Sequence, residues 1–155
     1  MTVSACANRR DGRAFDILLV EPDSESVSRF TESLEAAANA NTVTIVPTSA
    51  DALDFVNQRG DYTEAPRPDL VLLDLHLPDA SGTEVLAEIK NHPQIRQVPI
   101  LVLTSSDAPE DINQSYELHA NAYLQKPASP DESDQLVQAI EDFWLNYARL
   151  PPKEQ

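Results

Sequence analysis

Polar side chains that could carry out phosphoryl transfer follow four short apolar runs of this sequence. Glu21 and Asp23 follow the first run, and Asp74, Thr104 and Lys126 follow three later ones. Magnesium prefers oxygen ligands such as carboxylates, and a carboxylate can also act as a nucleophile toward a phosphoryl group. A lysine would neutralise charge on that group, and a threonine hydroxyl could then bind its oxygen and trigger a conformational change. These residue types therefore indicate metal-assisted phosphoryl transfer to a carboxylate.

The residues around these groups predict the elements that must position them. Five runs of apolar and β-branched residues are predicted to form buried strands, at residues 17–20, 43–46, 70–73, 100–103 and 122–124. Helical stretches are predicted between or after them, at residues 27–34, 52–56, 85–89, 109–118 and 136–149. Near-continuous apolar strands that alternate with helices are typical of a parallel sheet covered on both faces, a doubly wound α/β fold. Because parallel strands end at one edge of the sheet, the polar side chains should converge there.

The composition limits the partners and the location of the chain. Its 155 residues fit one domain, and its net charge of −15 argues against direct nucleic-acid binding. Only three lysines accompany eight arginines on a strongly acidic chain, which resembles proteins of salt-loving archaea, with an ordinary acidic protein as the alternative. The single cysteine, Cys6, excludes a disulfide framework, and no apolar run is long enough to span a membrane. We therefore expect a halophilic, cytoplasmic protein that binds neither nucleic acid nor membrane.

Four motifs give the sequence a family resemblance. They are Ile-Leu-Leu-Val-Glu21, Leu-Val-Leu-Leu-Asp74-Leu-His-Leu-Pro78 with Gly82, Pro99-Ile-Leu-Val-Leu-Thr104-Ser, and Ala122-Tyr-Leu-Gln-Lys126-Pro127. With these motifs the chain resembles the receiver domains of two-component response regulators. The resemblance implies a flavodoxin-like (βα)5 fold with strand order 2-1-3-4-5. It places a flexible leader at residues 1–15, the receiver at 16–148 and a C-terminal tail at 149–155.

The resemblance also implies roles in phosphorylation and switching. Asp74 would accept a phosphoryl group from a histidine kinase, and Lys126 would form a salt bridge with the phosphate. Thr104 would be the switch hydroxyl and Tyr123 the switch aromatic. Two structural alternatives stay open: Thr104 also suits a strand end by its β propensity, and Tyr123 also suits a plain core position.

The implied metal site departs from the family pattern. The family usually has two adjacent acidic residues after the first strand, whereas this sequence has Glu21, Pro22 and Asp23. The other implied ligands of Mg²⁺ are Asp74 and the main-chain carbonyl of His76. Because proline brings no carboxylate, we hypothesise that Asp23, or a water held by Glu21, substitutes and leaves a weaker site. Both acids would also favour the positive end of the helix that follows.

Shorter motifs give a closer resemblance. They are Ser115-Tyr-Glu-Leu-His119-Ala-Asn, Ile140-Glu-Asp-Phe-Trp-Leu145 and Leu150-Pro151, which are similar to single-domain regulators that work with cyanobacterial phytochrome kinases. This likeness implies a stand-alone receiver with a phytochrome-like or PAS-type histidine kinase and a downstream protein target. A homodimer through the face of the last helix is a further option. Phe143 and Trp144 are expected to pack, and Trp144 also suits an interface.

We expect a switch rather than an enzyme, and the sequence discriminates among three alternative functions. A phosphorylation-independent binding module would result if Pro22 has removed the metal site. Mg²⁺-dependent phosphorylation distinguishes this module from the switch. A phosphatase with an aspartate nucleophile needs an acid two residues past Asp74, where His76 stands. Flavin binding needs a phosphate-cradling loop after the first strand, but that segment is acidic and the chain has only 3 glycines.

Overall fold

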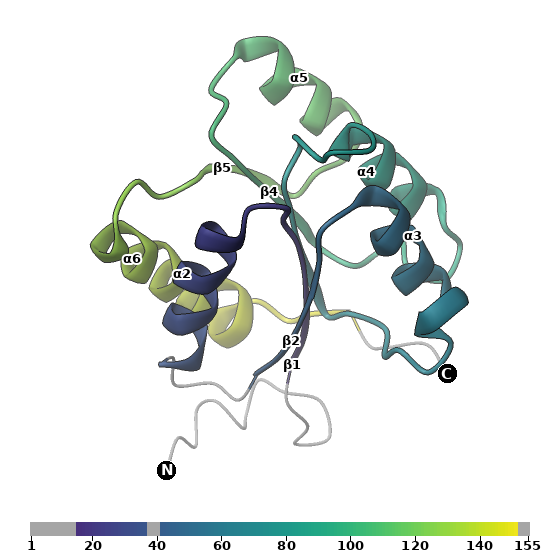
Figure 1. The fold of residues 1–155 in the computed structure, drawn as a ribbon, viewed down its shortest axis with the longest axis horizontal. Helices are drawn as coiled ribbons and strands as arrows, with labels where there is room; N and C mark the ends of the chain where they lie inside the picture. The colour runs from purple at the N-terminus through teal and green to yellow at the C-terminus, as the bar shows by residue number, and fades with distance from the viewer. Residues whose placement is uncertain (1–14, 37–40, 152–155) are drawn as a thin grey trace.

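A computed structural model describes residues 15–36 and 41–151, which form a five-stranded sheet between two layers of helices (Figure 1). The strands are β1 Phe15–Val20, β2 Asn41–Val46, β3 Leu70–Leu73, β4 Ile100–Thr104 and β5 Ala122–Gln125. They are hydrogen-bonded in the order β2-β1-β3-β4-β5, and every neighbouring pair is parallel. The predicted strands and their order are therefore confirmed. The predicted leader and Cys6 lie outside the described residues, except that Phe15 begins β1.

The helices occupy the five predicted stretches, and only the end of the last one differs from its prediction. They are α2 Ser24–Glu35, α3 Ser49–Asn57, α4 Gly82–Asn91, α5 Pro109–Glu117 and α6 Pro130–Ile140, with a 3₁₀ turn, η2 Gly60–Tyr62, after α3. Helices α2 and α6 pack together on one face of the sheet, and α3, α4 and α5 cover the other (Figure 1). Among the helices of residues 15–36 and 41–151, none combines the length and the apolar character needed to cross a bilayer.

Side-chain alternation along the strands divides the core into two halves. In β1, Ile17 and Leu19 belong to the cluster under α2 and α6, which includes Phe30. Leu18 and Val20 belong to the cluster under α3 and α4. Because both faces of the strand are buried, the strand is a continuous apolar run instead of an alternating one. The same burial fixes the strand register, since a slip of one residue would exchange the two faces.

Polar residues fix the point at which each helix begins. The side chains of Asp23, Thr48, Ser81 and Ser129 accept hydrogen bonds from main-chain amides in the first turns of α2, α3, α4 and α6. Pro109 occupies the first turn of α5. These residues satisfy or remove amide donors that a helix leaves unpaired at its start. The loops that join strand ends to helix starts are therefore anchored on the helix side, at the edge of the sheet where the polar residues lie.

The last helix differs from its prediction near the C-terminal end. A single α-helix was expected to continue to about Arg149, but α6 ends at Ile140 and a π-helical segment, η3 Glu141–Tyr147, follows it. Ile140 and Leu145 are both buried and lie five residues apart, which is the spacing of the hydrogen bonds in a π-helix. Leu145 is therefore buried in the core, whereas an α-helical spacing predicts that position for Phe143. The prediction that Phe143 packs is wrong for the core, because the residue is 55% exposed and its ring contacts only that of Trp144 among the described aromatic rings. Trp144 packs against the cluster under α2 and α6, as predicted.

Candidate functional site

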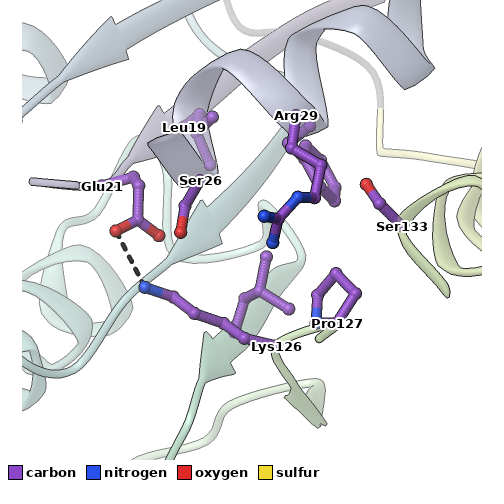
Figure 2. Close-up of a pocket in the computed structure, with 9 residues that line it drawn as sticks. Leu19, Glu21, Ser26, Arg29, Lys126, Pro127 and Ser133 are labelled. Carbon is purple, nitrogen blue, oxygen red and sulfur yellow. Dashed lines mark hydrogen bonds and ion pairs between the residues drawn. The ribbon is translucent and has the colours of Figure 1, made fainter. Parts of the chain in front are cut away.

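Three charged side chains from separate strand ends meet at the carboxyl edge of the sheet. Glu21 follows β1, Asp74 follows β3 and Lys126 follows β5. The Lys126 ammonium lies 2.8 Å from Oε2 of Glu21 and 2.8 Å from Oδ2 of Asp74. Figure 2 shows Lys126 extended toward Glu21 along the edge of a pocket. Both carboxylates are almost fully buried, with 3% of Glu21 and 4% of Asp74 exposed. One cation therefore serves two buried anions.

The main chain holds Asp74 in a fixed orientation. Its amide donates a hydrogen bond to the carbonyl of Val20 at 3.0 Å, which ties it to the end of β1. Its Oδ1 atom accepts a hydrogen bond from the amide of His76 at 3.0 Å. Gly82, at the start of α4, packs so closely that an added Cβ would overlap the main-chain oxygen of Asp74. The loop after β3 is therefore closed tightly around the carboxylate.

At both Glu21 and Lys126, burial shifts the pKa in one direction and pairing with the opposite charge shifts it in the other. Burial raises the pKa of the Glu21 carboxyl, the hydrogen bond from Lys126 offsets part of that rise, and the charge of Asp74 adds to it. Burial by itself would lower the pKa of the Lys126 ammonium. The hydrogen bonds to Asp74 and Glu21, with their charges, outweigh burial and raise it above its ordinary value. Lys126 therefore stays charged at neutral pH and compensates the carboxylates only in part.

The structure places the predicted metal ligands in two groups. Glu21 and Asp74 converge, and the main chain of His76 is bonded to Asp74. The carboxylate of Asp23 instead accepts hydrogen bonds from the amide and the hydroxyl of Ser26, at 2.9 and 2.8 Å. Its expected role at the start of a helix is thus present, and its metal role stays a prediction. Within residues 15–36 and 41–151, no group of three His, Cys, Asp or Glu side chains is arranged to hold a metal ion.

The predicted switch residues are linked through one loop residue. Thr104 is fully buried at the end of β4, and its hydroxyl lies 3.4 Å from the amide of Ser106, which donates to it. The hydroxyl of Tyr123, which is half-buried, donates to the carbonyl of the same Ser106 at 2.9 Å. A change at Thr104 can therefore reach Tyr123 through Ser106. Their roles as switch residues stay predictions.

Two residues beside the site escaped the sequence analysis. Arg29 lies on α2 and lines a small pocket next to Lys126 and Glu21 (Figure 2), with a volume of about 20 Å³, enough for roughly one water molecule. Its spacing from Ser26, three residues earlier, could have placed it on the inner face of the helix. Asp79, in the loop after β3, accepts hydrogen bonds from the amides of Ser49 and Ala50 at 2.9 and 3.0 Å. Because those partners lie about 30 residues away in sequence, no local pattern indicates this contact.

Comparisons with known proteins agree with the fold and give the family of the chain. The model of the response regulator receiver domain matches residues 17–141. The response regulator Rcp1 of Synechocystis sp. is 44% identical over 136 residues, which cover 87% of this chain and 92% of that protein. The solved Mn(2+)-bound form of Rcp1 superposes with a TM-score of 0.84 at 40% identity, covering 89% of this chain and 99% of that one. The phosphorylated cyanobacterial phytochrome response regulator RcpA superposes with a TM-score of 0.87 at 40% identity, covering 90% and 100%.

Replacing Lys126 tests the charge balance of the site. In Lys126→Met, with divalent cations removed, Glu21 and Asp74 lose their shared cation, and we expect a loss of about 3 kcal/mol in the free energy of unfolding at neutral pH. The folded-state pKa of Glu21, already raised in the wild type, should rise further. A raised carboxyl pKa means that the folded state binds the proton more tightly, so the stability of the variant should increase as the pH falls from neutral toward 4.5.

Denaturant unfolding across that pH range measures this effect, and Lys90→Met is the matched control. Lys90 is also half-buried, but its ammonium binds the carbonyl of Val98 and the amide oxygen of Asn121, at 3.0 Å each, and no carboxylate of the described part of the chain. The control should lose stability without gaining this pH dependence. A Lys126→Met profile parallel to that of the control would contradict the account of the site.

Proposed function

Because the chain belongs to the response regulator receiver family, we propose that it is a phosphorylation-operated switch. Asp74 takes a phosphoryl group from a histidine kinase, and the phosphorylated chain changes its contacts with other proteins. The observation that carries this proposal is the buried Asp74 carboxylate at the end of β3, 2.8 Å from the Lys126 ammonium. A fixed carboxylate beside a cation suits nucleophilic attack on a negatively charged group. RcpA, whose structure is that of a phosphorylated protein, supports the proposal by similarity.

In the proposed step, a phosphoryl group moves from a histidine of the kinase to Asp74. A carboxylate oxygen of Asp74 attacks phosphorus while the P–N bond to the imidazole of the donor histidine breaks, and the imidazole leaves. Lys126 keeps its proton and turns its ammonium to the phosphoryl oxygens. The amide of His76, bonded to Oδ1 of Asp74, keeps the carboxylate from rotating during the attack. The chain itself is the acceptor and ends the step covalently modified, so we infer a switch and not an enzyme.

We propose Mg²⁺ as the metal ion of the site. Glu21, Asp74 and the main-chain carbonyl of His76 would hold it, and Oε1 of Glu21 accepts no hydrogen bond from the described residues. Such a set of hard oxygen donors fits Mg²⁺, which when bound would neutralise charge on the transferring phosphoryl group. Rcp1, solved in a Mn(2+)-bound form, supports a divalent cation. Asp23, or a water held by Glu21, would complete the ligand set in place of the carboxylate that Pro22 lacks.

The switch would pass from Asp74 to the α5 side of the sheet. A phosphoryl oxygen on Asp74 is an acceptor for the buried hydroxyl of Thr104, which now accepts from the amide of Ser106. As the hydroxyl turns toward the phosphate, that contact is lost and the loop at Ser106 moves. The hydrogen bond between Tyr123 and the carbonyl of Ser106 then breaks or shifts, which changes the surface that Tyr123 presents.

The proposed partners follow from the relatives and from the exposed aromatics. RcpA is a cyanobacterial phytochrome response regulator, so by similarity we propose a phytochrome-like or PAS-type histidine kinase and a downstream protein target. The cytoplasmic location and the lack of nucleic-acid binding stay predictions. A homodimer through the last-helix face is the proposed assembly. Phe143, 55% exposed, stacks edge to face on Trp144 there, with ring centroids 5.2 Å apart.

Replacing the phosphoacceptor tests the function directly. Wild type incubated with acetyl phosphate and Mg²⁺ should gain one phosphoryl group in intact-mass spectra, whereas Asp74→Asn should gain none, because the amide is a poor nucleophile. Asp107→Asn, the same change in an exposed loop residue at the same edge, is the matched control and should label like wild type. A labelled Asp74→Asn would falsify the assignment. An unlabelled but folded wild type would favour the phosphorylation-independent binding module.

Restoring the missing acid tests the effect of Pro22 on metal binding. Pro22→Asp adds a carboxylate next to Glu21, and we expect it to tighten the Kd for Mg²⁺ by about tenfold, since one more charged ligand adds to the site. Calorimetric titration of both proteins at equal salt measures the change. If Pro22→Asp binds Mg²⁺ no more tightly than wild type, the proline does not limit the site.

Truncating an exposed aromatic tests the proposed dimer. Phe143→Ala should weaken self-association by about tenfold or more, since exposed aromatics often dominate interface energies. Sedimentation velocity over a concentration series, with and without acetyl phosphate, measures the dimer. Ile45→Ala is the matched control, because Ile45 is an exposed apolar residue, 38% exposed, on β2. An effect of the control alone would move the interface to β2.

A further inference from the structure

The loop between β3 and α4 folds into a short hairpin beside the proposed phosphorylation site. The amide of Gly82 donates to the carbonyl of Leu75 at 2.8 Å, and His76 pairs with Ser81 in an antiparallel bridge. These two contacts close the base of the hairpin, so residues 77–80 form its tip. Because the base is closed, a contact that holds the tip also restrains the base.

The base of this hairpin contributes main-chain groups of His76 to the proposed site. The amide of His76 donates a hydrogen bond to Oδ1 of Asp74 at 3.0 Å, and its carbonyl is a proposed ligand of Mg²⁺. A main-chain group has no rotamer to adjust, so its position depends on the contacts that hold the backbone around it. Residues that orient a metal ligand without touching the metal commonly set the affinity of the site.

Asp79 anchors the tip of the hairpin to the start of α3. Its Oδ1 atom accepts a hydrogen bond from the amide of Ser49 at 2.9 Å. Its Oδ2 atom accepts one from the hydroxyl of Ser49 at 2.9 Å and one from the amide of Ala50 at 3.0 Å. The hydrogen bonds from the two amides lower the pKa of the Asp79 carboxyl below its ordinary value, so the carboxylate is charged at neutral pH and faces the positive end of the helix.

Helix α3 has its own capping residue, so Asp79 does more than begin the helix. The side chain of Thr48 accepts a hydrogen bond from the amide of Asp51 at 3.1 Å, and Asp79 takes up the two amides before it from the far side of a long loop. The support is firm, since Phe55 of α3 is buried in the core cluster, and α3 lies beside α4 (Figure 1). Leu77, also at the tip, packs against the same cluster. The tip is therefore held by one apolar and one charged contact.

We propose that Asp79 is a positioning residue of the phosphorylation site. By fixing the hairpin to α3, it holds the main chain of His76 where its amide orients Asp74 and its carbonyl can bind the metal ion. Asp79 acts through His76 and does not touch the reacting atoms. The inference rests on the function proposed above, because it concerns the same site. Since Pro22 brings no carboxylate, a fixed main-chain carbonyl is a larger share of the ligand set.

The variant Asp79→Ala tests the proposal with two readouts, one of them without metal. In the metal-free protein, the amide of His76 should exchange its hydrogen with solvent at least about threefold faster than in wild type, because the hairpin is freed at its tip. The Kd for Mg²⁺ should weaken by about fivefold, because the carbonyl of His76 is no longer held in place. Nuclear magnetic resonance measures the exchange, and calorimetric titration measures the Kd.

Three further variants make the comparison specific. Thr48→Ala removes the cap of the same helix, so it should lower the Tm and leave both readouts unchanged. Asp107→Ala removes one charge from an exposed loop at the same edge of the sheet, so it gives the purely electrostatic change in Kd. Asp79→Asn keeps an acceptor oxygen for the amide of Ser49 and should recover part of both readouts. It also replaces Asp79→Ala as the test variant if the latter does not fold.

The outcomes separate the inference from the function on which it rests. If wild type takes up a phosphoryl group but Asp79→Ala matches Asp107→Ala in either readout, the inference alone is overturned. Equal changes in Thr48→Ala also overturn it, because the effect would then come from the stability of α3. A wild-type protein that neither binds Mg²⁺ nor takes up a phosphoryl group overturns the proposed function, and the inference falls with it. Faster exchange and a weaker Kd in Asp79→Ala, partly recovered in Asp79→Asn, support the positioning role.

Discussion

The shared salt bridge of Lys126 is the interaction on which this structure depends. Two carboxylates, Glu21 and Asp74, are almost fully buried at the edge of the sheet, and one ammonium lies 2.8 Å from each of them. Burying such charges is costly unless they are paired, so the ends of three strands must stay in register to keep the cation in place. The apolar faces of β1 and β3 supply that register, because a slip of one residue would expose their buried side chains. The packing of the core thus holds the charged side chains of the site in position.

The charges of Lys126, Glu21 and Asp74 depend on one another, so replacing one of these residues alters the whole site. A single ammonium compensates two carboxylates only in part, which is why burial and the charge of Asp74 raise the pKa of Glu21. Pro22 brings no carboxylate, so under the proposed function less negative charge is available at the site to hold the metal ion. Arg29, on the adjacent helix, lines the same pocket as Glu21 and Lys126.

Most of the fold and the main site could be predicted from the sequence, because both depend on local patterns. Continuous apolar runs predict strands buried on two faces, and the topology of a doubly wound sheet brings their carboxyl ends together. Phe143 was placed wrongly because the π-helical segment changes the spacing of buried residues from three or four to five, and no residue type indicates such a segment. The contact of Asp79 with α3 joins residues about 30 positions apart, so it was not accessible to local patterns either. The halophilic character rests on composition and stays a prediction.

The central claim is that Asp74 itself carries the phosphoryl group, and chemical mapping of the modified residue tests it most directly. Borohydride reduces an aspartyl phosphate to homoserine, so wild type treated with acetyl phosphate and Mg²⁺ should be reduced, digested and sequenced by mass spectrometry. The account predicts homoserine at position 74 alone, and none when Mg²⁺ is withheld. Homoserine at Asp23 or at another aspartate, or none at all in a folded and Mg²⁺-treated sample, would contradict it.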